Sequence, residues 1–159
     1  MTRNLCVVVA VLGLTSIVAL GQAKPDLKVL TGTWKLNVEK SKYSPGPGPK
    51  SQTLTWKTSA TGFDFTVETV TAEGKATQQR ASGNAEGKPY SWKGTTASGM
   101  RTTKWVDAFT AEEVDTVDGK VVTSRTAVIS KDGKTLTVTS KGVNPQGKPT
   151  SNTTVYEKQ

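Results

Sequence analysis

The chain has no histidine, and its only cysteine is Cys6, close to the N-terminus. The lack of histidine excludes Ser-His-Asp and Cys-His catalysis, imidazole acid–base chemistry and histidine-ligated zinc. We expect Cys6 to be removed with an export signal, which would leave no disulfide, no thiol nucleophile and no thiolate ligand for a metal. A domain of this size can be stabilised by its hydrophobic core without disulfides.

Residues 1–23 have the features of a signal peptide. Arg3 supplies a positive charge, Val7–Leu20 is an apolar run, and Gly21-Gln22-Ala23 offers small residues for cleavage after Ala23. The run is shorter than the roughly 20 residues that a membrane-spanning helix needs, so an uncleaved anchor is the less favoured alternative. We predict a secreted or periplasmic protein, as in a bacterial envelope. Its mature part, residues 24–159, would form one domain with no stable insertion in a membrane.

Two groups of acidic residues could in principle provide paired carboxylates for general acid–base catalysis: Asp64 with Glu68, and Glu112, Glu113 and Asp115. Both groups lie in or near expected turns, with lysines close in sequence, which favours surface charge. The sequence has neither the ligand spacing of a calcium loop nor a glycine-rich loop before a helix. We therefore expect no metal, no cofactor and no enzymatic activity.

The formal net charge is +8, and removal of residues 1–23 would lower it by the one charge of Arg3. The lysines are scattered along the chain without a run of five or six. This pattern favours solvated lysines in turns over a docking surface for anionic lipid or polysaccharide. No nucleic-acid-binding motif is present, so we expect no nucleic-acid partner.

Apolar and polar residues alternate through most of the chain, as they do in β-strands. The pattern is clearest at Trp34, Leu36 and Val38, in a first strand expected over residues 31–38 after a polar lead-in, Lys24–Leu30. No window shows a sustained helical repeat, so little helix is expected beyond the signal. Further strands are expected near Leu54–Trp56, Phe63–Val67, Ala76–Gly83, Tyr90–Lys93, Arg101–Ala108, Glu112–Val117, Val121–Ser130, Thr135–Lys141 and Thr150–Tyr156.

The connections between these strands have recognisable turn chemistry. The segment Pro45–Pro49 alternates proline with glycine and predicts an irregular or polyproline-like connector. A glycine followed by lysine recurs as in tight hairpins, where glycine supplies a positive φ, at Gly74, Gly87, Gly119, Gly133 and Gly147. Regular strand-and-turn spacing predicts a meander that curls closed, because closure removes unpaired edges.

The expected strand Ala76–Gly83 is unusual because almost nothing on either face is apolar. In one register Gln78 and Arg80 face the interior, and in the other Gln79 and Ala81 do. A polar wall would favour a hydrated cavity, since an unpaired buried arginine is costly. The alternative is a short, frayed strand at a gap in the barrel, and the sequence leaves both interpretations open.

Aromatic residues provide the candidates for a ligand site. Trp34 is expected to fill the core and seal one end of the barrel, whereas Trp56 and Trp92 are candidates to line a cavity. Arg125 shares one face of its strand with Val121, Thr123, Ala127 and Ile129, which makes it a candidate inward charge for an anionic head group. The opposite register would place it in solvent, and that alternative stays open.

The segment Gly32-Thr33-Trp34-Lys35-Leu36 resembles the Gly-x-Trp opening of the first strand in lipocalins and fatty-acid-binding proteins, together the calycins. Residues 154–158 resemble the last strand of the fatty-acid binders, in which an arginine and a tyrosine two residues apart hold the ligand carboxylate. Tyr156 matches that tyrosine, while Thr154 stands at the arginine position. The helical lid of that family is replaced by the Pro-Gly connector. Residues 32–159 also resemble small exported bacterial proteins described as lipocalin-like.

We therefore predict an all-β, antiparallel up-and-down β-barrel of about 8–10 strands, lipocalin-like and monomeric. Its expected function is non-covalent binding of a small hydrophobic or amphipathic ligand by Trp56, Trp92, Arg125 and Tyr156. The alternative is a filled barrel that acts as a structural or cell-envelope interaction module through its basic turns. A continuous cavity would favour the first hypothesis, and a packed interior with lysines gathered at one end would favour the second.

Overall fold

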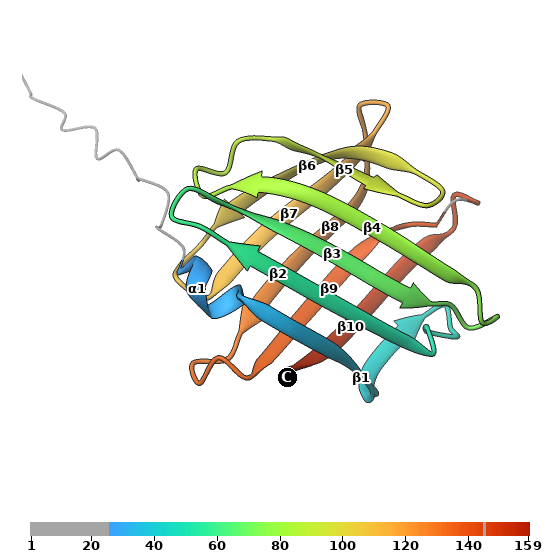
Figure 1. Cartoon of the computed structure of the whole chain (residues 1–159). Coiled ribbons are helices and arrows are strands. Elements are labelled where there is room, and N and C mark those ends of the chain that lie inside the picture. The colour runs from blue at the N-terminus through green and yellow to red at the C-terminus, as the bar shows by residue number, and fades with distance from the viewer. Residues whose placement is uncertain (1–25, 145) are drawn as a thin grey trace, which may run out of the picture.

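Ten strands with alternating buried and exposed residues form nearly all of the structure, a computed structural model that describes residues 26–144 and 146–159 (Figure 1). The expected signal peptide, residues 1–23, lies outside the described residues. The strands are β1 (Gly32–Ser44), β2 (Ser51–Thr58), β3 (Gly62–Val70), β4 (Ala76–Asn84), β5 (Tyr90–Gly94), β6 (Ser98–Trp105), β7 (Thr110–Val117), β8 (Lys120–Ile129), β9 (Thr135–Val143) and β10 (Pro149–Lys158).

Each strand pairs antiparallel with its neighbours in sequence, and β1 also pairs with β10, so that the sheet closes on itself. Closure leaves no sheet edge exposed for aggregation. The predicted all-β, antiparallel up-and-down barrel is confirmed. β1 is longer than predicted because it continues past an irregularity between Asn37 and Lys42, where the Asn37 side chain accepts a hydrogen bond from the Lys40 backbone N–H at 3.0 Å.

The turns follow the chemistry expected from their glycines. The glycines that precede a lysine have φ between +69° and +86°, a conformation that side chains with a Cβ rarely adopt: Gly74, Gly87, Gly119, Gly133 and Gly147. Pro45–Pro49 lies outside the strands and connects β1 to β2, as predicted. It lies at the end of the barrel opposite the N-terminal helix (Figure 1).

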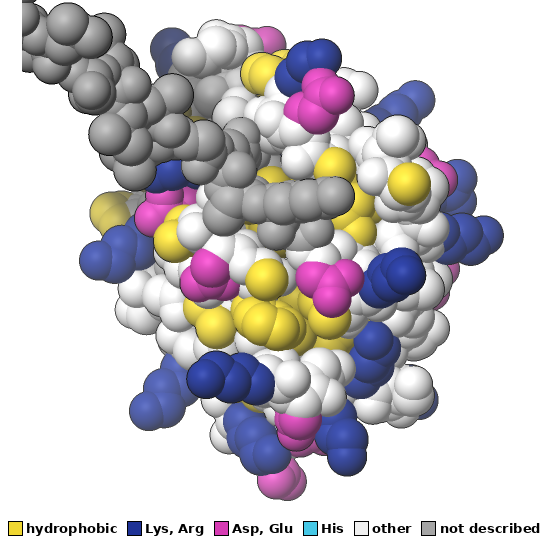
Figure 2. All heavy atoms as spheres, turned by 90° about the vertical axis from the view of Figure 1, so that its left-hand side faces the viewer, with side chains coloured by type: hydrophobic (Ala, Val, Ile, Leu, Met, Phe, Trp, Pro, Cys, Tyr) yellow, Lys and Arg dark blue, Asp and Glu magenta, His cyan; other side chains and the backbone are white. Residues whose placement is uncertain are grey.

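A short helix, α1 (Leu27–Leu30), closes the other end of the barrel. This corrects the expectation of a polar lead-in at Lys24–Leu30, because Leu27 and Leu30 are both buried and pack in the core. Trp34 is fully buried beneath the helix, and its indole Nε1 donates to the Leu30 carbonyl oxygen at 2.8 Å. Figure 2 looks at this end and shows apolar side chains gathered at its centre with charged side chains around them. No helix among the described residues is long and apolar enough to cross a membrane.

Strand register decides which side chains enter the barrel. In β4 the register with Gln79 and Ala81 inside is the one observed, and Arg80 is exposed. The pairing of β7 with β8 shifts in register between Asp115 and Thr116 of β7. This shift interrupts the alternation of inward and outward side chains in β8. Val121 is consequently exposed and does not share the inner face of Arg125, which the unbroken pattern had predicted.

Candidate functional site

The interior of the barrel contains a cavity of about 490 Å³. It extends from an apolar floor towards the end that carries the Pro45–Pro49 connector and the β3–β4 turn. Side chains from most strands line it, including Tyr43, Gln52, Leu54, Trp56, Phe65, Val67, Thr69, Gln79, Arg101, Glu113, Arg125, Ala127, Leu136, Val138, Ser140, Asn152, Thr154 and Tyr156. Its volume lies within the range of pockets that hold small molecules.

The floor of the cavity is aromatic and aliphatic. Trp56 of β2 stacks on Phe65 of β3, with ring centroids 4.9 Å apart and an interplanar angle of 19°. The two residues face each other in the β2–β3 register, which brings inward positions of neighbouring strands into contact. Leu54 and Leu136 extend this floor and are also buried. An apolar portion of a ligand placed here would be removed from water.

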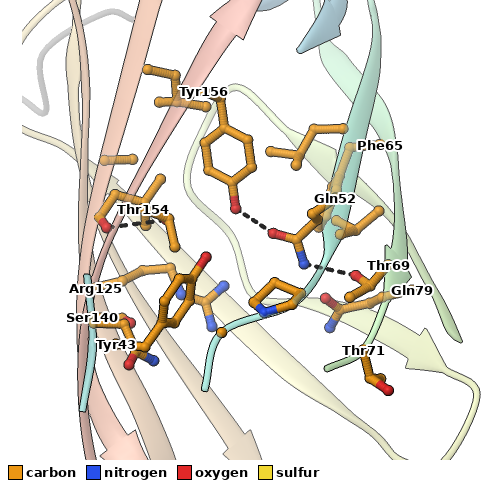
Figure 3. Close-up of a pocket in the computed structure, with 18 of the residues that line it drawn as sticks. Tyr43, Gln52, Phe65, Thr69, Thr71, Gln79, Arg125, Ser140, Thr154 and Tyr156 are labelled. Carbon is orange, nitrogen blue, oxygen red and sulfur yellow. Dashed lines mark hydrogen bonds between the residues drawn. The ribbon is translucent and has the colours of Figure 1, made fainter. Parts of the chain in front are cut away.

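A chain of hydrogen bonds crosses the cavity above this floor (Figure 3). The Tyr156 hydroxyl donates to Gln52 Oε1, and Gln52 Nε2 donates to Thr69 Oγ1 at 2.7 Å. Burial raises the pKa of Tyr156 to about 12, so its hydroxyl keeps its proton at neutral pH. The Tyr43 hydroxyl is buried without a hydrogen-bond partner among the described residues. Buried polar atoms are rarely left unsatisfied, so this hydroxyl is a candidate contact for a ligand.

Four charged side chains of β6, β7 and β8 form a cluster, which we call the charge cluster: Arg101, Glu113, Asp115 and Arg125. Arg101 and Asp115 are only 3% and 4% exposed and form a bidentate pair, Nε–Oδ1 at 2.6 Å and Nη2–Oδ2 at 2.9 Å. Arg125 donates to Asp115 Oδ2 at 2.5 Å. Glu113 Oε2 lies 3.6 Å from Arg101 Nη1 and 3.5 Å from Arg125 Nη1.

The sheet register assembles the charge cluster. Arg101 of β6 lies directly opposite Asp115 of β7, and Glu113 of β7 lies directly opposite Arg125 of β8. Opposite charges at facing positions of one sheet surface attract each other. Burial alone would raise the pKa of Asp115, but hydrogen bonds from Arg101 and the charges of both arginines hold it below its usual value. Asp115 is therefore ionised at neutral pH.

The prediction that Glu113 and Asp115 are surface charges was wrong, because both face the interior of the barrel. Glu112 is exposed, 3.6 Å from Lys104, as the sequence indicated. Asp64 and Glu68 are exposed as well. The expectation rested on nearby turns and lysines, whereas it is Val114, 36% exposed, that lies on the outer face of this strand. The sequence signal that could have corrected it is the pair of arginines at interior positions of the adjoining strands.

Of the residues proposed from sequence to bind a ligand, Trp56, Arg125 and Tyr156 line the cavity. Arg125 is inward and 18% exposed. Trp92 is buried but does not line the cavity. Its indole instead lies over β5 and β6, where a Cβ added at Gly99 would be only 3.0 Å from it. The pairing that sequence analysis missed is that of Arg125 with two carboxylates.

Comparison with known proteins supports the fold. A solved structure of zebrafish ileal bile acid-binding protein in complex with cholic acid is similar to this chain, with a TM-score of 0.50 and 11% sequence identity. The alignment covers 82% of this chain and 99% of that one. At this identity the similarity shows a shared calycin-type barrel and does not assign a ligand. No protein-family model and no curated protein matches the sequence.

Proposed function

We propose that this protein is a non-catalytic carrier that binds one small amphipathic molecule inside its barrel, without a covalent bond. The cavity of about 490 Å³ is the observation that carries the proposal. Its aromatic floor suits an apolar body, and its hydroxyl, amide and guanidinium groups suit a polar end. Such a combination of apolar walls and a few polar groups is typical of small-molecule sites. The bile acid bound to a protein of the same fold is consistent with this use of the barrel.

The arrangement of the buried carboxylates supports a binding role over a catalytic one. A general acid needs a carboxyl group that carries a proton near neutral pH. Asp115 has a lowered pKa and accepts hydrogen bonds from two arginines, so it is ionised at neutral pH, and it is not among the residues that line the cavity. The alternative hypothesis, a filled barrel with a structural role, predicts a packed interior, and the cavity counts against it. Export to the periplasm or exterior remains part of the proposal, supported by the sequence of residues 1–23, and so does the expectation of a monomer.

Fluorescence titration with the neutral dye N-phenyl-1-naphthylamine would test binding in the cavity. Neighbouring residues of β9 provide a matched pair of variants, because Ser140 lines the cavity and Thr139 is exposed on the outer surface. We expect Ser140→Trp to fill the cavity and weaken dye binding at least tenfold, while Thr139→Trp leaves it unchanged. Equal binding by both variants, or no binding by the wild type, would contradict the proposal. Native mass spectrometry of protein purified without detergent would then identify a ligand retained from the host.

A further inference from the structure

The charge cluster determines which polar end the cavity accepts. We propose that the bound molecule has a neutral, hydrogen-bonding polar end, such as an alcohol, ketone or amide, and that the cavity discriminates against carboxylates and other anions. This inference rests on the proposed function and deepens it. It replaces the sequence-based expectation that Arg125 serves as the counter-charge of an anionic head group.

The positive charge of Arg125 is balanced by its neighbours. Two guanidinium groups and two carboxylates make up the charge cluster, so its formal charge is zero. Arg125 contacts both acids, with Asp115 at 2.5 Å and Glu113 at 3.5 Å. An anion placed beside Arg125 would therefore also lie close to two negative charges. Because Arg101 and Asp115 are almost completely buried, this repulsion is screened less than it would be at the surface, and it offsets the attraction to Arg125.

No spare cation is present among the described residues that line the cavity. The charged residues there are Arg101, Arg125, Glu113 and Glu73, and Glu73 lies at the mouth. Arg101 is 3% exposed and is occupied by Asp115 and Glu113. None of the described lysines lines the cavity, and most of them are exposed in turns or on the outer faces of strands, where solvent and salt screen them from the interior.

Neutral hydrogen-bond donors and acceptors surround the upper cavity. Tyr43 offers a hydroxyl without a partner among the described residues, and Gln79 and Ser140 offer an amide and a hydroxyl. A guanidinium has five N–H donors, and the contacts of Arg125 with its two acids leave some of them for a neutral oxygen. A neutral carbonyl or hydroxyl can accept from Arg125 without bringing a charge towards Glu113.

Competition between two probes of equal chain length would test the inference: 1-decanol and decanoate, each displacing N-phenyl-1-naphthylamine at pH 8. For the wild type we expect 1-decanol to bind at least tenfold more tightly. Any apolar cavity favours an alcohol to some degree, so the decisive quantity is the ratio of the two affinities and its change on mutation. Glu113→Gln removes one negative charge from the charge cluster, whereas Glu112→Gln removes one from the outer face of the same strand.

We expect Glu113→Gln to shift the affinity ratio towards decanoate by at least tenfold, because the charge cluster then holds two arginines and only one acid, Asp115. Glu112→Gln should leave the ratio within about twofold of the wild-type value, since solvent screens that position. A wild type that binds decanoate as well as 1-decanol would overturn the inference, and this arm needs no variant to fold. An unchanged ratio in a folded Glu113→Gln variant would also overturn it. If the wild type binds neither the dye nor either probe, the proposed function itself fails.

Discussion

Replacing Asp115 with asparagine should destabilise the fold more than any exposed charge substitution. Asp115 is 4% exposed and accepts hydrogen bonds from Arg101 at 2.6 and 2.9 Å and from Arg125 at 2.5 Å. In Asp115→Asn, Arg101 stays buried with Glu113 as its remaining acidic neighbour, 3.6 Å away. Removing one partner of a buried ion pair costs about 3–5 kcal/mol, a large part of the roughly 5–15 kcal/mol that stabilises a typical domain.

Urea unfolding at pH 7, followed by tryptophan fluorescence, would measure this loss of unfolding free energy. Glu112→Gln is the matched control, because Glu112 lies on the outer face of the same strand, 3.6 Å from Lys104. Exposed pairs of this kind contribute about 0–1 kcal/mol, so the control should remain close to the wild type. A loss below about 1 kcal/mol for Asp115→Asn would refute the view that the buried arginines depend on this carboxylate.

The same substitution should alter the dependence of stability on pH. The folded pKa of Asp115 lies below its unfolded value of about 3.9. Its contribution is therefore fully present above that unfolded pKa and is lost as the pH falls through the lower folded pKa. The difference in unfolding free energy between the wild type and Asp115→Asn should shrink below about pH 4. A difference that stays constant between pH 7 and pH 2 would contradict this reasoning.

Three further measurements test other parts of the structure. Trp34→Phe removes the indole hydrogen bond to α1 at a fully buried position, and calorimetry should show a loss of about 1–3 kcal/mol. Gly99→Ala would place a Cβ 2.1 Å from a backbone oxygen of β7, whereas the Cβ of Gly119→Ala would meet nothing within 4 Å. Gly119→Ala should lower the free energy of unfolding only by the roughly 1–2 kcal/mol of left-handed strain, and Gly99→Ala should lower it clearly more. Burial raises the pKa values of Tyr90 and Tyr156 to about 12, so absorbance at 295 nm should show both ionising well above pH 10, and stability should fall as the pH rises past their unfolded value of about 10.

Short-range patterns in the sequence were enough to predict the architecture. Alternation marked the strands, and glycine before lysine marked turns in which the glycine φ is positive. These features depend only on neighbouring residues, so they can be recognised without knowledge of the fold. The short helix at Leu27–Leu30 was missed because four residues cannot show a helical repeat, and its leucines become core residues only once the barrel end lies beneath them.

The site was predicted less completely because its chemistry depends on pairing between strands. Trp56, Arg125 and Tyr156 could be chosen as candidates from their strands alone, and all three line the cavity. The acids that pair with Arg125 could not be chosen in this way. The orientation of Glu113 and Asp115 becomes clear only from the register of β7 with β6 and β8. From the sequence alone, a charged residue in a strand is expected to face solvent. Its inward orientation can be recognised only when the oppositely charged residue facing it on the neighbouring strand is known.

The cost of burying the charge cluster bears on what the barrel is for. Removing ionised groups from water is expensive, and replacing a buried ion network with apolar residues of similar volume is often neutral or stabilising. A barrel that only needed to be filled would therefore gain little from two arginines and two acids in its interior. The charge cluster lies beside the cavity, with Arg125 18% exposed and Arg101 almost completely buried. Arg125 is thus held by two acids where it lines the cavity, and its charge is already compensated. We interpret the charge cluster as a fixed hydrogen-bond donor for a neutral ligand.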